Sequence, residues 1–444
     1  MNFKKIFILF LIVLILVLAG KNAKHEKTDK INLQFASWGS KSEIDILKPI
    51  LREFELKNPD IKVEFIHIPQ NYFQKIHLLF ASNLAPDVIF MNNLYLPIYA
   101  NAGMLEEIKE QEGKRGKEKG KRGMEVWRYG GMESGKPIIK PKSHTSIHQA
   151  FQPSVQPILS TFYAKSLKSL SYNKKLYAIP RDISTLVIYY NKDIFDRYNV
   201  PCPNKYWTFN DFLILAKKLT KDTNKDGKTD IWGMSFEEDL LFYLPYLMSE
   251  GGGVLSDDLK TMIINTPESK KGLQFYADLR NKYNVAPKKS ESASATMAQL
   301  FLQGKLAMHL SGRWLVPKYR TDAKFDWNVI NFPTGDKGSV VPLDASGWSI
   351  AKNSKHKKEA VRLIEYLSSK ESIEKFSKSG LIVPARIDVA EGDFLQDKKS
   401  PRNNKVFTEI IKTAKNTPVS TNYSEIQDDL KEKMNYLFNA AGKF

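Results

Sequence analysis

Alternating and helical spacings of apolar residues divide the start of the chain into strands and helices. Residues 31–35 alternate between apolar and polar side chains, which predicts a strand. The apolar residues between 44 and 54 recur at helical spacing, and Asn58-Pro59 ends that helix. A second strand and helix follow before a third strand at 88–90. The β-α-β-α-β order predicts a parallel sheet covered by helices.

A charged turn at Arg181 and Asp182 precedes a strand that is apolar on both faces. Such a strand is typical of the inside of a sheet. The turn therefore lies where the chain enters a core. An arginine beside a carboxylate at that place fits a polar small-molecule site as well as it fits a structural ion pair.

Two later segments share this plan of an apolar strand next to Gly, Trp or Arg. In Gly304–Trp314 the strand would end at Ser311-Gly312, which would turn Trp314 toward solvent or ligand. The other segment, 344–351, contains Gly347-Trp348. Polar edges that follow buried strands are where open α/β sheets bind ligands.

At these three places, in this order, the sequence resembles the extracellular solute-binding proteins of ABC transporters, in particular family 1, whose members carry sugars. The resemblance covers nearly all of the chain after residue 20 except about 110–159. It rests on the joint order of six segments, which are Phe35-Ala-Ser-Trp38, Ala85-Pro-Asp-Val-Ile89, Tyr177-Ala-Ile-Pro180, Tyr189-Tyr-Asn-Lys-Asp193, Gly304–Trp314 and Gly347-Trp348 with the helix that follows.

The resemblance implies a type II periplasmic-binding-protein-like α/β fold. Two discontinuous lobes, each a mainly parallel sheet flanked by helices, would be joined by three hinge crossings. The crossings are expected near Val187–Asn191, Ala307–Ser311 and Ser346–Ile350. The first lobe would then comprise 31–188 and 309–346, and the second lobe 189–308 and 347–444.

The resemblance also implies the function. Closure of the two lobes on a carbohydrate, most readily an oligosaccharide, would present a liganded shape to the membrane permease subunits of an ABC importer. No covalent chemistry and no cofactor is needed. We expect a monomer that binds no nucleic acid.

Tryptophan and polar residues near the three segments are the candidate ligand contacts. An indole face can stack on the apolar face of a sugar ring while polar neighbours bind its hydroxyls. Each tryptophan could instead belong to the core, and each charged residue could form an ordinary salt bridge. The candidates are Trp38, Asn92, Asn93, Arg181, Asp182, Glu237, Arg313, Trp314, Asp344, Trp348 and Arg386.

Two other functions remain open on the sequence. Acids such as Asp182 and Glu237 could serve a secreted carbohydrate-active enzyme, since glycosidases use paired carboxyl groups. The candidate cleft arginines and a net charge of +18 would suit a phosphorylated or otherwise anionic ligand. The lysines are spread over many segments, however, which favours solvated faces over a nucleic-acid surface.

The loop at 222–230 has the first half of a calcium-binding pattern. Its oxygen-bearing residues, at alternate positions before a glycine, are Asp222, Asn224, Asp226 and Asp230. The twelfth position is Gly233, so the bidentate glutamate of a calcium loop is missing. A metal-free turn rich in Asp and Asn is the favoured interpretation, with calcium as the alternative.

The N-terminus predicts export. Residues 1–20 have two lysines followed by a short apolar run, as in a secretory signal peptide, and 21–30 form a polar spacer. We expect the protein in the periplasm or on the outer face of the cytoplasmic membrane, with a retained anchor as the alternative. Leu18-Ala19-Gly20 resembles a lipoprotein signal, but Lys21 replaces the cysteine that would be acylated.

One further segment and one residue complete the picture. Residues 110–159 form a basic insertion with little periodicity, which we expect to be disordered. Cys202 is the single cysteine, so the fold has no intrachain disulfide.

Overall fold

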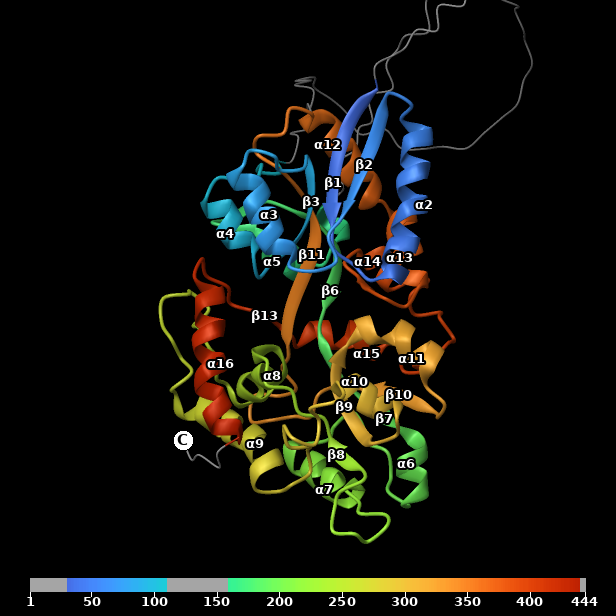
Figure 1. Cartoon of the computed structure of the whole chain (residues 1–444), viewed down its shortest axis with the longest axis vertical. Helices are drawn as coiled ribbons and strands as arrows, with labels where there is room; N and C mark the ends of the chain where they lie inside the picture. Colours follow the sequence, from blue (N-terminus) through green and yellow to red (C-terminus); the bar gives the residue numbers. More distant parts are fainter. Residues whose placement is uncertain (1–29, 110–158, 440–444) are drawn as a thin grey trace, which may run out of the picture.

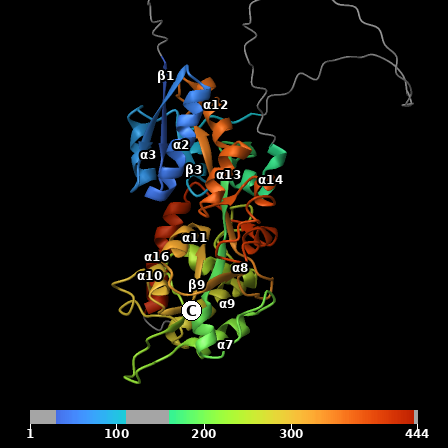
Figure 2. The same ribbon diagram turned by 90° about the vertical axis from the view of Figure 1, so that its right-hand side faces the viewer.

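The computed structural model describes residues 30–109 and 159–439. The predicted signal peptide, nearly all of the polar spacer and nearly all of the basic insertion lie outside these ranges. The described chain forms two lobes, stacked along the long axis of the molecule in both views (Figures 1 and 2). Each lobe is built around its own β-sheet, as the resemblance implied.

The first lobe contains a seven-stranded sheet in the order β12-β6-β11-β3-β1-β2, with β13 paired to β11. β1 pairs in parallel with β2 and β3, which confirms the parallel sheet predicted for the first hundred residues. β11 is antiparallel to both β3 and β6, so the sheet is mixed rather than mainly parallel. Its strands are β1 (Ile31–Ser37), β2 (Ile61–His67), β3 (Val88–Asn92), β6 (Ile179–Ser184), β11 (Pro342–Ile350), β12 (Val383–Pro384) and β13 (Lys415–Asn416).

The helices of the first lobe come from both ends of the chain. α12 and α13 pack against α2, so the C-terminal part of the chain returns to this lobe. The helices are α2 (Lys41–Lys57), α3 (Tyr72–Ala81), α4 (Leu96–Asn101), α5 (Ala164–Ser169), α12 (Lys357–Leu367), α13 (Lys370–Lys378) and α14 (Ile387–Ala390). A small hairpin of β4 (Ser171–Tyr172) and β5 (Lys175–Leu176) follows α5.

The second lobe contains a four-stranded sheet in the order β10-β7-β9-β8. β7 is antiparallel to β9 and β10, while β8 and β9 are parallel, so this sheet is also mixed. Its strands are β7 (Leu186–Asn191), β8 (Trp232–Met234), β9 (Leu306–Gly312) and β10 (Trp327–Ile330). Its helices are α6 (Lys192–Arg197), α7 (Phe209–Leu219), α8 (Leu240–Glu250), α9 (Pro267–Asn281), α10 (Met297–Leu302), α11 (Val316–Asp322) and α16 (Tyr423–Asn439).

Two connections join strands of the first sheet to strands of the second. Thr185 joins β6 to β7, and residues 331–341 join β10 to β11. After α14 the chain continues through residues 391–405 to α15 (Val406–Glu409) and the short helix η3 (Ile410–Lys412). It then joins the first sheet at β13 and passes on to α16 in the second lobe. None of these connections lies within 187–191, 307–311 or 346–350, where the crossings were expected.

The strand pairing corrects the lobe boundaries drawn from the sequence. Residues 307–311 were expected to cross between lobes, but they lie in β9, an inner strand of the second sheet. Most of 309–346 therefore belongs to the second lobe, and 347–378 to the first. An apolar run shows that a strand is buried, but it does not show which sheet the strand joins.

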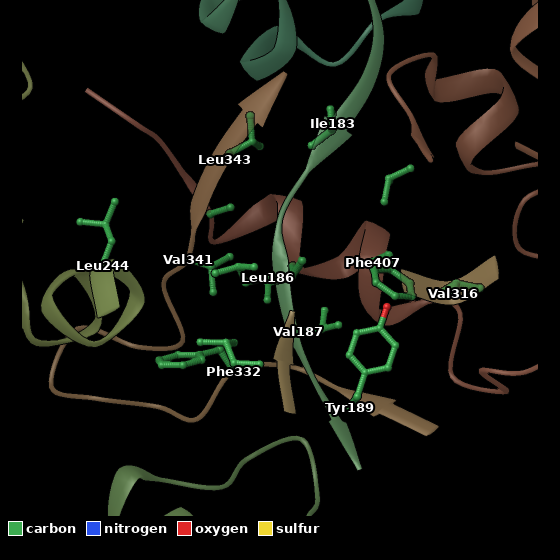
Figure 3. Close-up of a cluster of buried hydrophobic side chains, with 14 of the residues drawn as sticks. Ile183, Leu186, Val187, Tyr189, Leu244, Val316, Phe332, Val341, Leu343 and Phe407 are labelled. Carbon is green, nitrogen blue, oxygen red and sulfur yellow. The ribbon is translucent and has the colours of Figure 1, made fainter. Parts of the chain in front are cut away.

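Buried apolar side chains continue from one lobe into the other along β6, β7 and β11 (Figure 3). Ile183 and Leu343 belong to the first sheet, while Leu186 and Val187 begin the second. The Tyr189 hydroxyl donates a hydrogen bond to the Gly312 carbonyl at 2.8 Å, which fixes β7 against the end of β9. The strands that join the lobes are therefore anchored in a packed core on both sides.

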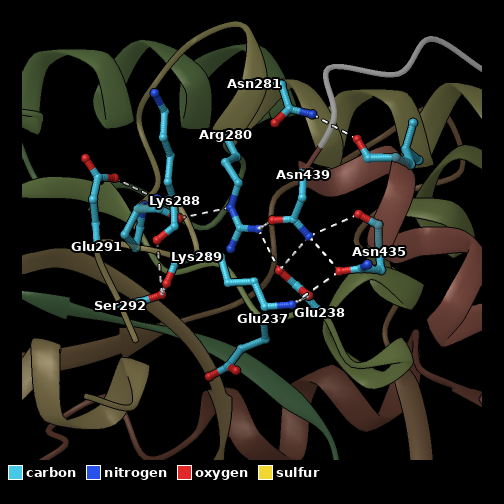
Figure 4. A network of polar contacts seen from close by, with 12 residues as sticks. Glu237, Glu238, Arg280, Asn281, Lys288, Lys289, Glu291, Ser292, Asn435 and Asn439 are labelled. Carbon is cyan, nitrogen blue, oxygen red and sulfur yellow. Dashed lines mark hydrogen bonds and ion pairs between the residues drawn. The ribbon is translucent and has the colours of Figure 1, made fainter. Parts of the chain in front are cut away.

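The C-terminal helix α16 closes the outside of the second lobe. Phe438 is fully buried and meets the rings of Phe236 and Tyr276 edge-on, with centroid distances of 5.2 and 5.6 Å. Polar contacts continue this attachment (Figure 4), since Arg280 Nη1 donates to Asn439 Oδ1 at 3.1 Å. Within 30–109 and 159–439, no helix has the length and apolar character needed to span a membrane.

Candidate functional site

A cavity of about 260 Å³ lies between the lobes. The first lobe contributes the end of β1, the start of α2, β6 and one residue of β11, while the second lobe contributes the turn after β9. The lining residues are Trp38, Glu43, Arg181, Asp182, Ile183, Ser184, Arg313, Trp314, Ser346, Leu381, Ile382 and Val383. Five of the residues predicted from the sequence are thus brought together here.

Arg181 and Asp182 form a buried ion-pair network with Glu43 on the first-lobe wall. Arg181 Nη1 donates to Glu43 Oε1 at 2.5 Å, and Arg181 Nε donates to Asp182 Oδ2 at 2.6 Å. The guanidinium also lies over the Phe90 ring, 4.2 Å from its centroid. Burial raises the pKa of Asp182, and the charge of Arg181 opposes that effect. The two alternatives left open by the sequence are therefore combined, because this structural ion pair is also part of the cavity wall.

Glu43 was not identified from the sequence. It stands at the first turn of α2, where its backbone N–H donates to the side chain of the N-cap residue Ser40 at 3.4 Å. Gly39 has a positive φ of 144°, and a Cβ there would lie 2.9 Å from Glu43 Oε2. The signal that could have found Glu43 is the Ser40-x-x-Glu43 spacing, which usually marks a helix start and here also places a carboxylate at the cleft.

Trp38 and Trp314 approach the cavity from opposite lobes. Trp38 is half-buried and packs on Phe90 and Tyr72, with centroid distances of 4.2 and 4.9 Å. Trp314 lies in the short helix η2 (Arg313–Leu315) and is 37% exposed. A Cβ at Gly312 would lie 1.8 Å from the Trp314 ring, so the glycine leaves the space that the indole occupies.

Arg313 is buried beside Trp314 and is only 3% exposed. Its guanidinium lies over the rings of Phe394 and Phe407, at 4.3 and 4.9 Å from their centroids, and Nη1 donates to Asn404 Oδ1. Nε and Nη2 are buried without a hydrogen-bond partner in the described parts of the chain. Burial lowers the pKa of Arg313 to about 9, which still leaves the side chain charged at neutral pH.

The other six predicted ligand residues lie outside the cavity lining, Trp348 and Arg386 among them. Trp348 is fully buried in the first lobe against Phe35 and Phe90, with centroid distances of 5.5 and 4.6 Å, so it is a core residue rather than a sugar platform. Arg386 donates from Nε and Nη2 to Asp388 at 3.0 and 2.7 Å. Its charge is satisfied locally, outside the cavity lining.

Asn92, Asn93 and Asp344 hold the loop after β3 against β11. Asn92 Oδ1 accepts from the Tyr95 N–H at 3.2 Å, and Asn93 Nδ2 donates to Asp344 Oδ1 at 2.8 Å. Burial raises the pKa of Asp344, and the hydrogen bond from Asn93 opposes the effect. These three residues are outside the cavity lining, and their observed contacts are structural.

Glu237 follows β8, and Trp314 follows β9. The two strands are parallel, so both residues lie beyond the carboxyl ends of neighbouring strands. Figure 4 shows the Glu237 carboxyl group apart from the network that joins Glu238 to Arg280. It is not among the residues that line the cavity. Burial raises the pKa of Glu237 to about 7, and the nearby charge of Asp239 adds to the shift.

The oxygen atoms of the 222–230 loop are used to form the turn. Asp222 Oδ2 accepts from the Gly227 N–H, and Asp226 Oδ1 accepts from the Lys228 N–H. Asp230 Oδ2 accepts from the Thr223 N–H at 2.7 Å. Within the described residues, no group of three or more His, Cys, Asp or Glu is placed to hold a metal ion.

The chain matches a known protein family and solved structures. Residues 38–374 match the family model of the bacterial extracellular solute-binding proteins. This chain belongs to that family. The fold is that of the type II periplasmic binding proteins.

Solved structures share the whole architecture. An ABC substrate-binding protein from Listeria monocytogenes, in complex with cycloalternan, is 23% identical and has a TM-score of 0.76 over 93% of this chain and 95% of its own. The maltose/maltodextrin-binding domain from Bdellovibrio bacteriovorus, bound to maltotriose, is 22% identical with a TM-score of 0.70 over 93% and 95%. At these identities the likeness establishes the fold.

Sequence relatives match over a shorter span. A maltooligosaccharide ABC transporter solute-binding lipoprotein from Streptococcus pneumoniae is 26% identical over 60% of this chain and 61% of its own length. A relative from Brucella abortus is 24% identical over 61% of this chain and 64% of its own. The matched region thus spans less than two thirds of the length of these relatives.

Proposed function

We propose that this protein captures an oligosaccharide between its two lobes and delivers it to the permease subunits of an ABC importer. The observation that carries the proposal is the cavity between the lobes, lined by a tryptophan from each lobe. Two indoles that approach from opposite sides can cover the apolar faces of a sugar chain, while the polar residues between them bind its hydroxyls.

The names of several relatives support an oligosaccharide as the ligand. The Streptococcus relative is named for maltooligosaccharide and a Bacillus subtilis relative for maltodextrin, and the Listeria and Bdellovibrio structures contain bound oligosaccharides. We extend that class of ligand to this chain. The protein would act outside the cytoplasmic membrane as a monomer, without a cofactor, and the closed form would be the shape that the permease recognises.

The chemistry of a glycosidase is less well supported by the geometry. A glycosidase needs two carboxyl groups on either side of the bond that is cleaved. Asp182 is held by Arg181, and Glu237 is outside the cavity lining, so these two acids are not placed as such a pair. We therefore propose binding without turnover.

Calorimetric titration of the purified protein with maltotriose, maltotetraose, galactooligosaccharides and oligosaccharides of uronic acids tests the proposal. At least one should bind with 1:1 stoichiometry and be recovered intact. Trp314→Ala should weaken that binding about 10- to 100-fold, because a stacked indole buries apolar surface worth roughly 1.5–3 kcal/mol.

The matched control is Tyr206→Ala, which removes an aromatic ring that is 76% exposed and does not line the cavity. It should leave the affinity unchanged. The proposal fails if no oligosaccharide binds. Cleavage of the sugar that is lost in Glu237→Gln would instead establish the enzyme.

A further inference from the structure

Arg313 differs from the other buried arginines in having no ion-pair partner, because Asp397, a carboxylate whose charge acts on it, is bound to Arg320. Arg181 is paired with Glu43 and Asp182, and Arg280 with Glu238. In the part of the chain that the structure describes, no carboxylate lies within ion-pair distance of Arg313. A buried charge without a partner is costly, and proteins usually compensate it.

The surroundings of Arg313 leave one edge of the guanidinium without a hydrogen-bond partner. Two phenylalanine rings lie over it, and Asn404 accepts from Nη1. The remaining donors, Nε and Nη2, form the edge from which a guanidinium donates two parallel hydrogen bonds to one carboxylate or phosphate. Both donors are unpartnered and buried, on a residue that lines the cavity.

The charged groups are distributed unequally over the two walls of the cavity. On the first-lobe wall, two carboxylates share the single positive charge of Arg181, so that wall offers acceptors to sugar hydroxyls. On the second-lobe wall the charged group is Arg313, which can only donate. The four formal charges add to zero, but they are separated, with the unshared positive charge at the second lobe.

We propose that the ligand is an acidic sugar whose anionic group binds the Nε–Nη2 edge of Arg313, while its hydroxyls meet the wall formed by Glu43 and Asp182. The inference rests on the proposed function and narrows its substrate class. The shared chemistry is a pair of anionic oxygens on a sugar, as in the carboxylate of a uronic acid or the phosphate of a sugar phosphate.

Calorimetric titration with matched probes tests the charge directly. Trigalacturonate and trimannuronate are compared with their methyl esters, which keep the sugar skeleton and remove the charge, and glucose 6-phosphate is compared with glucose. At least one anionic probe should bind about 10- to 100-fold more tightly than its neutral counterpart, the gain expected of a charged hydrogen-bonded pair. Which anionic probe gains affinity distinguishes a uronate from a phosphate.

Variants test whether Arg313 is the source of the preference for an anionic probe. Arg313→Gln should remove the preference for the anionic probe over its neutral counterpart, whereas Arg313→Lys should retain part of it. The control Arg386→Gln removes a charge that Asp388 already compensates and should keep the full preference. If Arg313→Gln does not fold, the comparison of acid with ester in the unchanged protein still decides the question.

The outcomes separate this inference from the proposed function. Binding of neutral oligosaccharides, with no anionic probe bound more tightly than its neutral counterpart, would overturn the acidic ligand and leave the sugar-binding function intact. A preference for anionic probes that survives in Arg313→Gln would overturn the role of Arg313. If no sugar binds, acidic or neutral, both proposals fail.

Discussion

Two tryptophans with similar sequence surroundings have opposite roles at the scale of single residues. Trp348 directly follows Gly347, and Trp314 closely follows Gly312, yet Trp348 is fully buried and Trp314 is 37% exposed. A Cβ at Gly347 would lie 2.1 Å from the Ile179 carbonyl oxygen, so this glycine allows strands to approach each other. Gly312 instead makes room for the indole of Trp314. The sequence shows both glycines but not what fills the space beside each.

The raised pKa of Glu237 predicts a pH-dependent stability. Because burial raises this pKa to about 7, the protonated form favours the folded state, and that contribution is full below the ordinary pKa of glutamate and lost as the pH rises through 7. Glu237→Gln should therefore raise the free energy of unfolding at pH 8 on the order of 1–3 kcal/mol, and change it little at pH 4.

Urea unfolding at pH 4, 6 and 8 measures this difference. Glu432→Gln, on the exposed face of α16, is the matched control and should give the same small change at each pH. A variant at position 237 that follows the pH dependence of the unchanged protein would show that the buried carboxyl group does not cause it.

At the scale of elements, local signals were predictable and pairing was not. Thr208 and Asp211 form the capping box at the start of α7 that the spacing Thr-x-x-Asp indicates, and the strands near the N-terminus follow their alternation. The assignment of β9 to the second sheet depends on β7 and β8, which lie more than 70 residues earlier. The hydrophobic pattern indicates which residues of a strand are buried. The sheet that the strand joins depends on contacts with distant segments of the chain.

The end of β9 can be tested through Gly312. Gly312→Ala places a methyl group where the Trp314 ring lies, so the indole must move away from its observed position. Because Trp314 is partly exposed, it can move at small cost to the fold. We expect oligosaccharide affinity to fall about 10-fold or more, with a change in the free energy of unfolding below about 1.5 kcal/mol.

Titration calorimetry and urea unfolding of Gly312→Ala give the two quantities. Gly253→Ala is the control, since its nearest neighbour would be the Ile263 side chain, at 3.3 Å, and Gly253 does not line the cavity. A loss of stability as large as the loss of binding would mean that Gly312 supports the fold rather than the placement of Trp314.

At the scale of the whole molecule, the site exists because two lobes meet. Arg181 and Asp182 are placed by the first sheet, and Arg313 and Trp314 by the second. The Arg181–Asp182 turn was found from the sequence because charge directly precedes a buried strand. Glu43 was missed because its partner lies 138 residues away. Residues 187–191, first expected to be a hinge, are hydrogen-bonded to strands on both sides, which leaves Thr185 as the crossing between β6 and β7.

Closure of the lobes should therefore shorten distances between lobes and leave distances within a lobe unchanged. Spin labels at Lys48→Cys on α2 and Lys318→Cys on α11, in a Cys202→Ser background, report across the cleft from exposed positions. Labels at Lys48→Cys and Lys370→Cys both lie in the first lobe. Double electron–electron resonance should show a shorter distance for the first pair when a bound oligosaccharide is saturating, and no change for the second. An unchanged distance across the cleft would mean that the ligand binds without closure, and the permease would then have no difference in shape to recognise.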